Sequence, residues 1–289
     1  MSLFDALVDD AGLFPPTALP MADALERHRA DLAEGNPVLT HRFLCAAGRV
    51  PELREHLDAY PGLLPEPLRL GIILDTPTPP PLDDLDVELV EVPGGRAVDL
   101  DGLGTPGARQ FVEVTAAQLP VDLPPGTGLK VRCGGTVAAA FPSAQDLGAF
   151  ISYCVEHGTP FKATAGLHNA VRHFDPSLGV DRHGFLNLVV GVCAAVQGED
   201  PVPVLGTTDV GELVRLARAV PESAAVRARE LLVSYGSCST RTPIEDLVAL
   251  GLVAEHRGDG SGAERNSRVG AAAGTAGATG GIGTTEGNE

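Results

Sequence analysis

Eight short apolar runs recur along the first ~250 residues, and they limit the folds open to this chain. Short apolar runs rich in β-branched residues are typical of strands that are buried in a parallel sheet. The predicted strands span residues 6–8, 42–45, 70–74, 87–92, 110–114, 129–133, 161–164 and 231–235.

Helical patterns lie between several of these runs. Residues 144–157 follow Ser143, an expected N-cap, and carry apolar side chains at helical spacing. Residues 243–250 have Thr242 as expected N-cap, Pro243 in the first turn and Glu245 at the capping-box position. Further helices are predicted over 20–34, 51–59, 184–197 and 209–220.

Eight strands, several separated by helices, favour a (β/α)8 barrel, with a doubly wound open sheet as the alternative. The connectors 75–86, 93–109 and 115–128 are rich in proline and glycine and have room for only a turn of helix each. We therefore expect a partly irregular outer ring. The barrel domain should span residues 1–254. Residues 255–289 are dominated by Gly, Ala and Thr and are expected to form a disordered tail.

Composition narrows the functional classes. A net charge of −17 argues against nucleic-acid binding, which needs clustered lysine and arginine. The five scattered cysteines form no CxxC pair, so neither a disulfide framework nor a zinc knuckle is indicated. The amino terminus lacks a signal-peptide pattern, and the longest apolar run is too short to span a bilayer. We expect a cytoplasmic protein with no membrane partner, and the sequence leaves a homo-oligomer open.

The segment FKATAGLHNAVRH at residues 161–173 carries the clearest functional signal. It places Lys162 inside a short apolar strand, and a buried charge is costly unless it is paired or serves chemistry. Gly166 ends the strand, and His168 and Arg172 follow within a few residues. This pattern predicts a site.

Active sites of such barrels are assembled at the carboxyl ends of the strands. The acids at these positions are Asp9 or Asp10, Asp75, Glu91 and Glu113; the cations are Lys130, Arg132 and Lys162. Alternation places Lys130 and Arg132 on one face of their strand. If they face inward, cations and carboxylates share one cavity, either for catalysis or as structural ion pairs. The catalytic candidates are Lys162, Lys130, Glu113 and His168.

Two turns could hold an anion through backbone N–H groups. One contains Gly134 and Gly135, and the other contains Ser237 and Ser239, although glycines also follow strands for steric reasons. With Arg132, Arg172 and Asn187, these residues form the predicted anion-binding set. The histidines at 168, 173 and 183 lack metal-ligand spacing, so we expect proton transfer from His168 or His183, or a structural role.

Four segments together resemble a family of uncharacterised bacterial proteins: DDAGLFPPTALPM at 9–21, LKVRCGG at 129–135, FKATAGLHNAVRH at 161–173 and HGFLN at 183–187. Family members more often have Tyr at the position of Asp10 and His at that of Asn169. The resemblance implies a fold rather than an activity. FKATAG and LKVRCGG are also distantly similar to the Schiff-base and phosphate-turn lysine segments of class I aldolases of the deoxyribose-phosphate type, in exchanged chain order.

Three functions remain open. The first is a lyase or aldolase-like enzyme without a cofactor, in which Lys162, its pKa lowered by Lys130 and Arg132, attacks the carbonyl of a phosphorylated or carboxylated substrate. The second is an enolising enzyme that holds Mg²⁺ through Asp75, Glu91 and Glu113, with Lys130 as base. The third is a non-catalytic protein that binds a small anion. Neither GxGxxG nor a P-loop is present, so adenosine-nucleotide binding is not expected.

Overall fold

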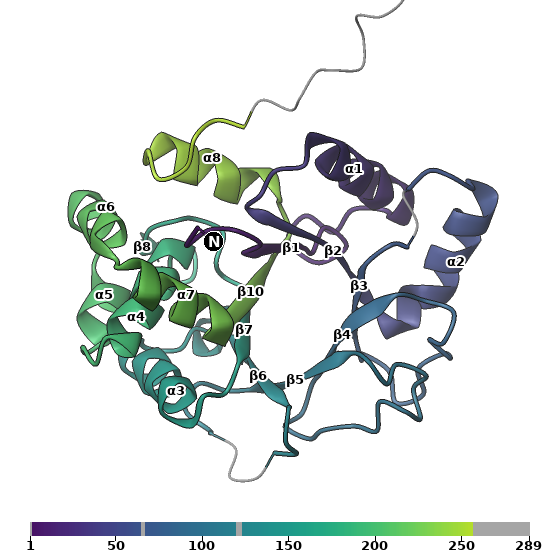
Figure 1. Cartoon of the computed structure of the whole chain (residues 1–289), viewed down its shortest axis with the longest axis horizontal. Helices are drawn as coiled ribbons and strands as arrows, with labels where there is room; N and C mark the ends of the chain where they lie inside the picture. Colours follow the sequence, from purple (N-terminus) through teal and green to yellow (C-terminus); the bar gives the residue numbers. More distant parts are fainter. Residues whose placement is uncertain (1, 65–66, 120–122, 257–289) are drawn as a thin grey trace, which may run out of the picture. The chain divides into compact units, whose positions relative to one another are not determined.

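The computed structural model, which describes residues 2–64, 67–119 and 123–256, contains a closed barrel of eight parallel strands (Figure 1). The strands follow one another around the barrel in the order β1, β2, β3, β4, β5, β6, β7 and β10. Their bounds are Val8–Asp10, Leu39–Ala46, Leu70–Ile73, Val87–Val92, Arg109–Val114, Gly128–Arg132, Phe161–Thr164 and Leu232–Ser237. The predicted (β/α)8 barrel is confirmed, and the open sheet is not formed.

The first barrel strand is shifted furthest from its predicted position. We expected β1 at residues 6–8, but Ala6 has a positive φ of 47° and the strand begins at Val8. It continues through Asp9 and Asp10, both of which are buried. Two consecutive aspartates normally indicate a strand end. Here they remain in the strand because cations inside and outside the barrel pair with them.

The outer ring is incomplete, as expected. Helices follow β1, β2, β6, β7 and β10, whereas the described residues of the connectors after β3, β4 and β5 form only turns and coil. In Figure 1 the helices accordingly surround one part of the barrel and loops surround the other. The principal helices are α1 (Met21–Glu34), α2 (Val50–Ala59), α3 (Ala144–His157), α4 (Phe185–Val196), α6 (Val210–Ala219) and α8 (Arg241–Ala249).

The sequence predicted the N-cap of α3 correctly and the N-cap of α8 incorrectly. Ser143 caps α3 in a complete capping box with Asp146, as predicted in part from the sequence. The predicted cap of α8 was wrong: the helix begins at Arg241, and Thr240 occupies the N-cap position without a side-chain cap. Thr242 instead donates its N–H to Ser239 Oγ at 3.2 Å.

The elements that were not predicted include α5 (Val202–Gly206), α7 (Glu222–Leu231) and the antiparallel hairpin of β8 (His173–Asp175) and β9 (Val180–Arg182). Helix α7 buries mostly alanines, including Ala224, Ala225 and Ala228, so its sequence shows little of the apolar periodicity that identifies a helix. The hairpin lies in the β7–α4 connection, at the carboxyl end of the barrel.

The apolar core lies largely between the barrel wall and the helices. Helix α4 is buried on nearly every side, as its sequence predicted. Within the described residues, no helix combines the length and the apolar character needed to cross a bilayer. The described residues up to 256 belong to one compact unit, and the predicted tail lies outside the described residues from 257 onward.

Candidate functional site

Four polar residues form a continuous row across neighbouring strands inside the barrel. Glu113 on β5 is in register with Lys130 on β6, Lys130 with Lys162 on β7, and Lys162 with Ser234 on β10. Parallel strands in register place such side chains at the same height in the barrel. The row brings together three of the four predicted catalytic residues.

Glu91 on β4 lies between the two lysine amines. Its Oε1 is 2.8 Å from Lys162 Nζ, and its Oε2 is 2.5 Å from Lys130 Nζ. Lys162 also pairs with Asp9, and Lys130 Nζ lies 3.0 Å from Glu113 Oε2. Burial favours neutral Glu91, but Lys130 and Lys162 outweigh it and hold the Glu91 pKa at about 2.

Asp9 on β1 extends these contacts to the opposite wall. Its carboxylate accepts hydrogen bonds from Thr40 Oγ1 and Ser234 Oγ, both at 2.7 Å, and pairs with Arg42 at 2.7 Å. Burial acts to raise the Asp9 pKa, but Lys162 and Arg42 lower it to about 2. The Asp9 carboxyl group is therefore ionised, and these hydrogen bonds and ion pairs stabilise its negative charge.

The ion pairs join into one network that alternates in charge, which we call the barrel network. In order, it contains Arg69, Glu88, Arg42, Asp9, Lys162, Glu91, Lys130, Glu113 and Arg132. Glu113 pairs with Arg132 through Nε at 3.0 Å. Five cations alternate with four carboxylates, so the network has one positive charge in excess.

The network becomes exposed toward the carboxyl end of the strands. The exposed fraction of the side chain rises from 1% at Lys162 to 5% at Lys130, 19% at Glu113 and 46% at Arg132. In the described part of the chain, Glu113 is the one residue with which the Arg132 guanidinium pairs. At its other end the network is also exposed, by 27% at Glu88 and 44% at Arg69, so it is most deeply buried in its middle.

One sequence signal for this site was missed. Lys130 and Lys162 are the two lysines of the whole chain, and every other basic residue apart from histidine is arginine. Arginine stays protonated in proteins, whereas a lysine amine can lose its proton and react. The chain therefore uses lysine only where two adjacent strands face the barrel interior. Asp9 and Arg42, which connect Lys162 to Glu88 and Arg69, carried no such signal beyond the position of Asp9 near a strand end.

The glycines of the predicted anion-binding turn pack against protein. A Cβ on Gly134 would lie 2.7 Å from the Gly166 Cα, and one on Gly135 would lie 2.7 Å from the Ala140 Cβ. The turns that follow β6 and β7 thus meet backbone to backbone. Close packing explains the absence of side chains at these positions, which is the steric interpretation left open by the sequence.

Other members of the predicted anion-binding set have partners within the protein. Ser237 Oγ donates to Ser239 O at 2.7 Å, and Ser239 Oγ lies 2.9 Å from Thr242 Oγ1. Asn187 Nδ2 donates to Val204 O and Thr207 O at 2.8 and 2.9 Å.

Arg172, another member of the predicted anion-binding set, also has partners within the protein. Its N–H donates to Asn187 Oδ1, and its guanidinium contacts the buried His183 and the Asp181 carboxylate. Burial lowers the His183 pKa, and its Nε2 lies 2.8 Å from the Pro142 carbonyl. These contacts fasten the β7–α4 connection to α4 and leave Arg132 as the predicted anion-binding side chain on the network.

His168 is separate from the lysine row in its contacts. Its Nδ1 lies 3.7 Å from Sγ of Cys238, which follows β10. Burial acts to raise the Cys238 pKa, but hydrogen bonds with His168 and Thr17 lower it to about 7. The carbonyl of Cys238 also accepts from Arg27, which pairs with Asp10. The sequence indicated His168 but gave no signal for Cys238.

The residues proposed for Mg²⁺ do not converge. Asp75 accepts the Gly48 N–H at 2.8 Å, whereas Glu91 and Glu113 both pair with Lys130. Among the residues that the structure describes, no group of three His, Cys, Asp or Glu is arranged to hold a metal ion.

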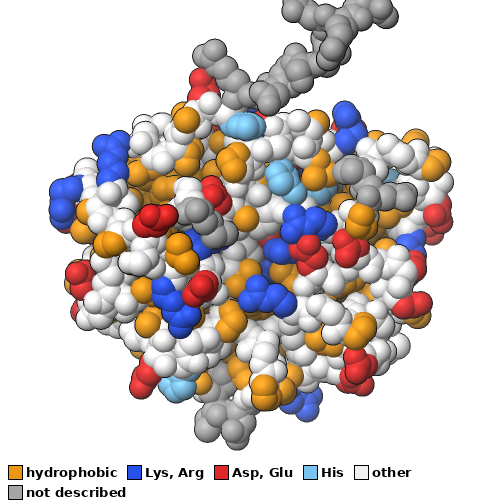
Figure 2. Space-filling model, in the orientation of Figure 1, with side chains coloured by type: hydrophobic (Ala, Val, Ile, Leu, Met, Phe, Trp, Pro, Cys, Tyr) orange, Lys and Arg blue, Asp and Glu red, His pale blue; other side chains and the backbone are white. Residues whose placement is uncertain are grey.

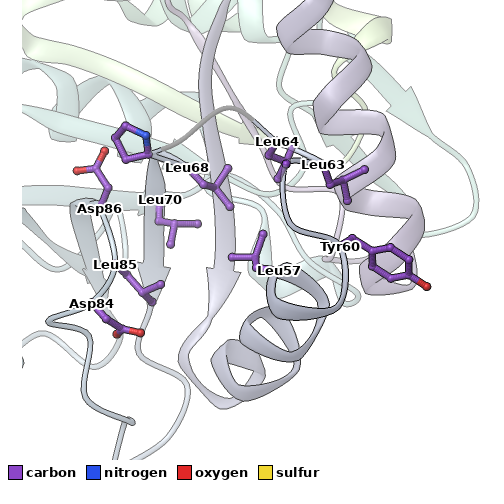
Figure 3. A pocket seen from close by; sticks show the side chains of 11 residues that line it. Leu57, Tyr60, Leu63, Leu64, Leu68, Leu70, Asp84, Leu85 and Asp86 are labelled. Carbon is purple, nitrogen blue, oxygen red and sulfur yellow. The ribbon is translucent and has the colours of Figure 1, made fainter.

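A surface cavity and the charges on one face of the molecule do not extend the predicted site. A cavity of about 520 Å³ lies between the end of α2 and the start of β3 (Figure 3), lined by leucines such as Leu57, Leu63 and Leu85. It includes none of the predicted site residues. On the face shown in Figure 2, basic and acidic side chains are interspersed, without a continuous basic surface.

Two comparisons with known proteins do not assign this chain to a family. A scan against protein-family models finds no model that matches this chain, and a search of curated proteins finds no match either. The resemblance to the bacterial family and to class I aldolases therefore stays a prediction, and function is argued from the barrel network.

Proposed function

We propose that the protein is an enzyme of the lyase type, in which a lysine amine inside the barrel attacks the carbonyl carbon of a small anionic substrate. The supporting observation is that the two lysines of the chain lie side by side on β6 and β7, where carboxylates surround them. A purely structural ion pair could use arginine, as the rest of this chain does. A (β/α)8 barrel with paired polar residues in its interior is compatible with enzymatic activity.

Lys130 is our preferred nucleophile, although the sequence pointed to Lys162. Lys130 pairs with Glu113, next to the exposed Arg132, whereas the Lys162 side chain is 1% exposed and pairs with the buried Asp9 and Glu91. A neutral Lys130 amine would add to the carbonyl, and loss of water would give a protonated imine. The bond between the carbons α and β to the imine then breaks: its electron pair forms an enamine, and the β-hydroxyl gives its proton to a carboxylate as an aldehyde leaves. Protonation of the enamine at its α carbon and hydrolysis of the imine by water release the second product and restore the amine.

In the resting state the amine is not yet a nucleophile. Burial acts to lower the Lys130 pKa, but the carboxylates of Glu91 and Glu113 outweigh it and raise the pKa. Catalysis therefore requires that protonated Lys130 transfer a proton to one of these carboxylates, and that the ion pair between the two groups be lost. Glu113 is the candidate acceptor because it is the more exposed of the two carboxylates.

The other two functions have weaker support. Each carboxylate proposed for Mg²⁺ already has a protein partner, so the enolising mechanism has no assembled donor set. A non-catalytic anion-binding protein would need the cations but not a reactive amine. It predicts that Lys130→Arg keeps ligand binding and that there is no covalent intermediate to trap.

Borohydride trapping tests the proposal. Full-length protein is incubated with a panel of short oxo acids, aldehydes and sugar phosphates, reduced with sodium borohydride and mapped by mass spectrometry. The chain offers only two lysine side chains, so an adduct is assigned without ambiguity. We expect an adduct on Lys130 that is lost in Lys130→Arg. An adduct on Lys162 would return the role to that residue, and no lysine adduct across the panel would overturn the lyase function.

A further inference from the structure

The carboxylate of Glu113 bridges two cations in the way that a bound substrate would. Its Oε1 accepts from Arg132 Nε and its Oε2 pairs with Lys130 Nζ, both at 3.0 Å. The two oxygens of a single planar carboxylate thus span the most exposed cation of the network's carboxyl end and the adjacent lysine. We call this position the anion seat.

From this geometry we infer that Glu113 occupies the anion seat only in the resting protein, and that the carboxylate of a short oxo acid replaces it during turnover. This inference rests on the proposed function, because it identifies the substrate class of the same site. Glu113 is also able to leave, since its side chain is 19% exposed whereas Glu91 is 3% exposed.

Charge explains why Glu113 would leave only in exchange for another anion. Without Glu113, the five cations of the network would face three carboxylates. A buried or half-buried cation that loses its partner is strongly unfavourable. A substrate carboxylate can take the place of Glu113 on Arg132. Within the described residues the guanidinium is paired through Nε alone, so it can donate two parallel hydrogen bonds to the incoming carboxylate.

The exchange would also prepare the nucleophile. If the incoming carboxylate binds Arg132 with its carbonyl toward Lys130, Lys130 keeps Glu91 but loses Glu113 as a partner. One of the two carboxylates that stabilise the protonated amine is then removed, and the displaced Glu113 can accept the proton. The free amine appears only when an acid occupies the seat, so Glu113 would be the residue that determines specificity.

Isothermal titration calorimetry of the full chain with acetate tests this. Acetate has the carboxylate but no ketone or aldehyde to form an imine, so its binding does not depend on lysine chemistry. We expect Glu113→Gln to lower the acetate dissociation constant about tenfold or more, because an ionic competitor is removed. The double variant Glu113→Gln/Arg132→Gln should lose this gain in acetate affinity. Arg132→Gln alone should bind acetate no more tightly than the unmodified chain. Glu212→Gln, which removes one exposed carboxylate outside the network, is the control and should leave acetate binding unchanged.

The outcomes separate the two proposals. Unchanged acetate affinity in Glu113→Gln, or a gain that survives Arg132→Gln, would overturn the anion seat. A larger gain for inorganic phosphate than for acetate would overturn the carboxylate assignment. If Glu113→Gln does not fold, Glu113→Asp is used instead: it is one methylene shorter, cannot span both cations and should also improve acetate binding. A gain for acetate without any borohydride adduct would retain the seat and reject the lyase.

Discussion

Lys130 and Lys162 are direct neighbours on adjacent strands, and the two oxygens of the Glu91 carboxylate hold their amines apart. Two adjacent buried ammonium groups would repel each other strongly at this distance if no anion lay between them. Glu91 is thus the residue on which the polar interior of the barrel depends.

Replacing Glu91 with glutamine should destabilise the fold markedly. The amide has nearly the same shape but no charge, so two buried ammonium groups would lose their shared counterion. Loss of one partner from a buried ion pair costs about 3–5 kcal/mol. Urea unfolding at pH 7 measures the change in the free energy of unfolding. Glu26→Gln, which breaks an exposed helical pair with Arg29, is the control and should leave stability unchanged. An equally stable Glu91→Gln would show that the network is dispensable for folding.

Stability should fall in acid as Asp9 and Glu91 are protonated. Both carboxyl groups have a pKa of about 2 in the folded protein, below the ordinary values of 3.8 and 4.5. A lowered folded pKa stabilises the protein above the ordinary pKa, and this contribution is lost as pH falls toward the folded pKa. We therefore expect a decline between about pH 5 and pH 2, and little carboxylate effect between pH 5 and 7.

Urea unfolding at a series of pH values measures this decline. Asp9→Asn should be less stable at pH 7 and should show a shallower acid dependence than the unmodified chain. Parallel pH curves for the two proteins would mean that Asp9 does not contribute.

The sequence predicted the barrel well because parallel strands and amphipathic helices leave local patterns. It also placed Lys130, Lys162, Glu91 and Glu113 near one end of the sheet. The pairing within the network could not be read from the sequence, because it depends on register between strands that are distant in the chain, as with Asp9 and Lys162. The same limit applies to Asn187, whose Nδ2 donates to Val204 in α5 and to Thr207 just after it, 17 and 20 residues further along the chain.

Cys238 should be the thiol that alkylating reagents modify first. Its pKa is about 7, whereas burial raises the pKa of Cys45, Cys133 and Cys193 to about 12 and also raises that of Cys154. Thiolate is the reactive form, so Cys238 alone should be substantially ionised at pH 7.5. Iodoacetamide labelling of the folded chain, mapped by mass spectrometry over time, measures the relative rates.

Removing the imidazole should shift this reactivity to higher pH. His168→Ala takes away the first hydrogen-bond partner of the thiolate, so the midpoint of the rate–pH profile should move from about 7 toward the ordinary thiol value of about 8.5. His157→Ala, which lies on exposed α3 surface, is the control and should leave the midpoint unchanged. An unaltered midpoint in His168→Ala would separate Cys238 from His168.

Gly166→Ala should destabilise the protein through a backbone contact at the end of β7. Gly166 has a φ of 74°, and an added Cβ would lie 2.7 Å from Cys133 O and 2.9 Å from Gly134 Cα. A left-handed conformation costs a non-glycine residue about 1–3 kcal/mol, and overpacking adds about 1–3 kcal/mol. Gly179→Ala isolates the first cost, because Gly179 has a φ of 67° but no atom within 4 Å of the added Cβ. Thermal unfolding should therefore rank Gly166→Ala clearly below Gly179→Ala. Equal unfolding temperatures would mean that the turns after β6 and β7 separate easily, and that glycine is required there for its backbone conformation alone.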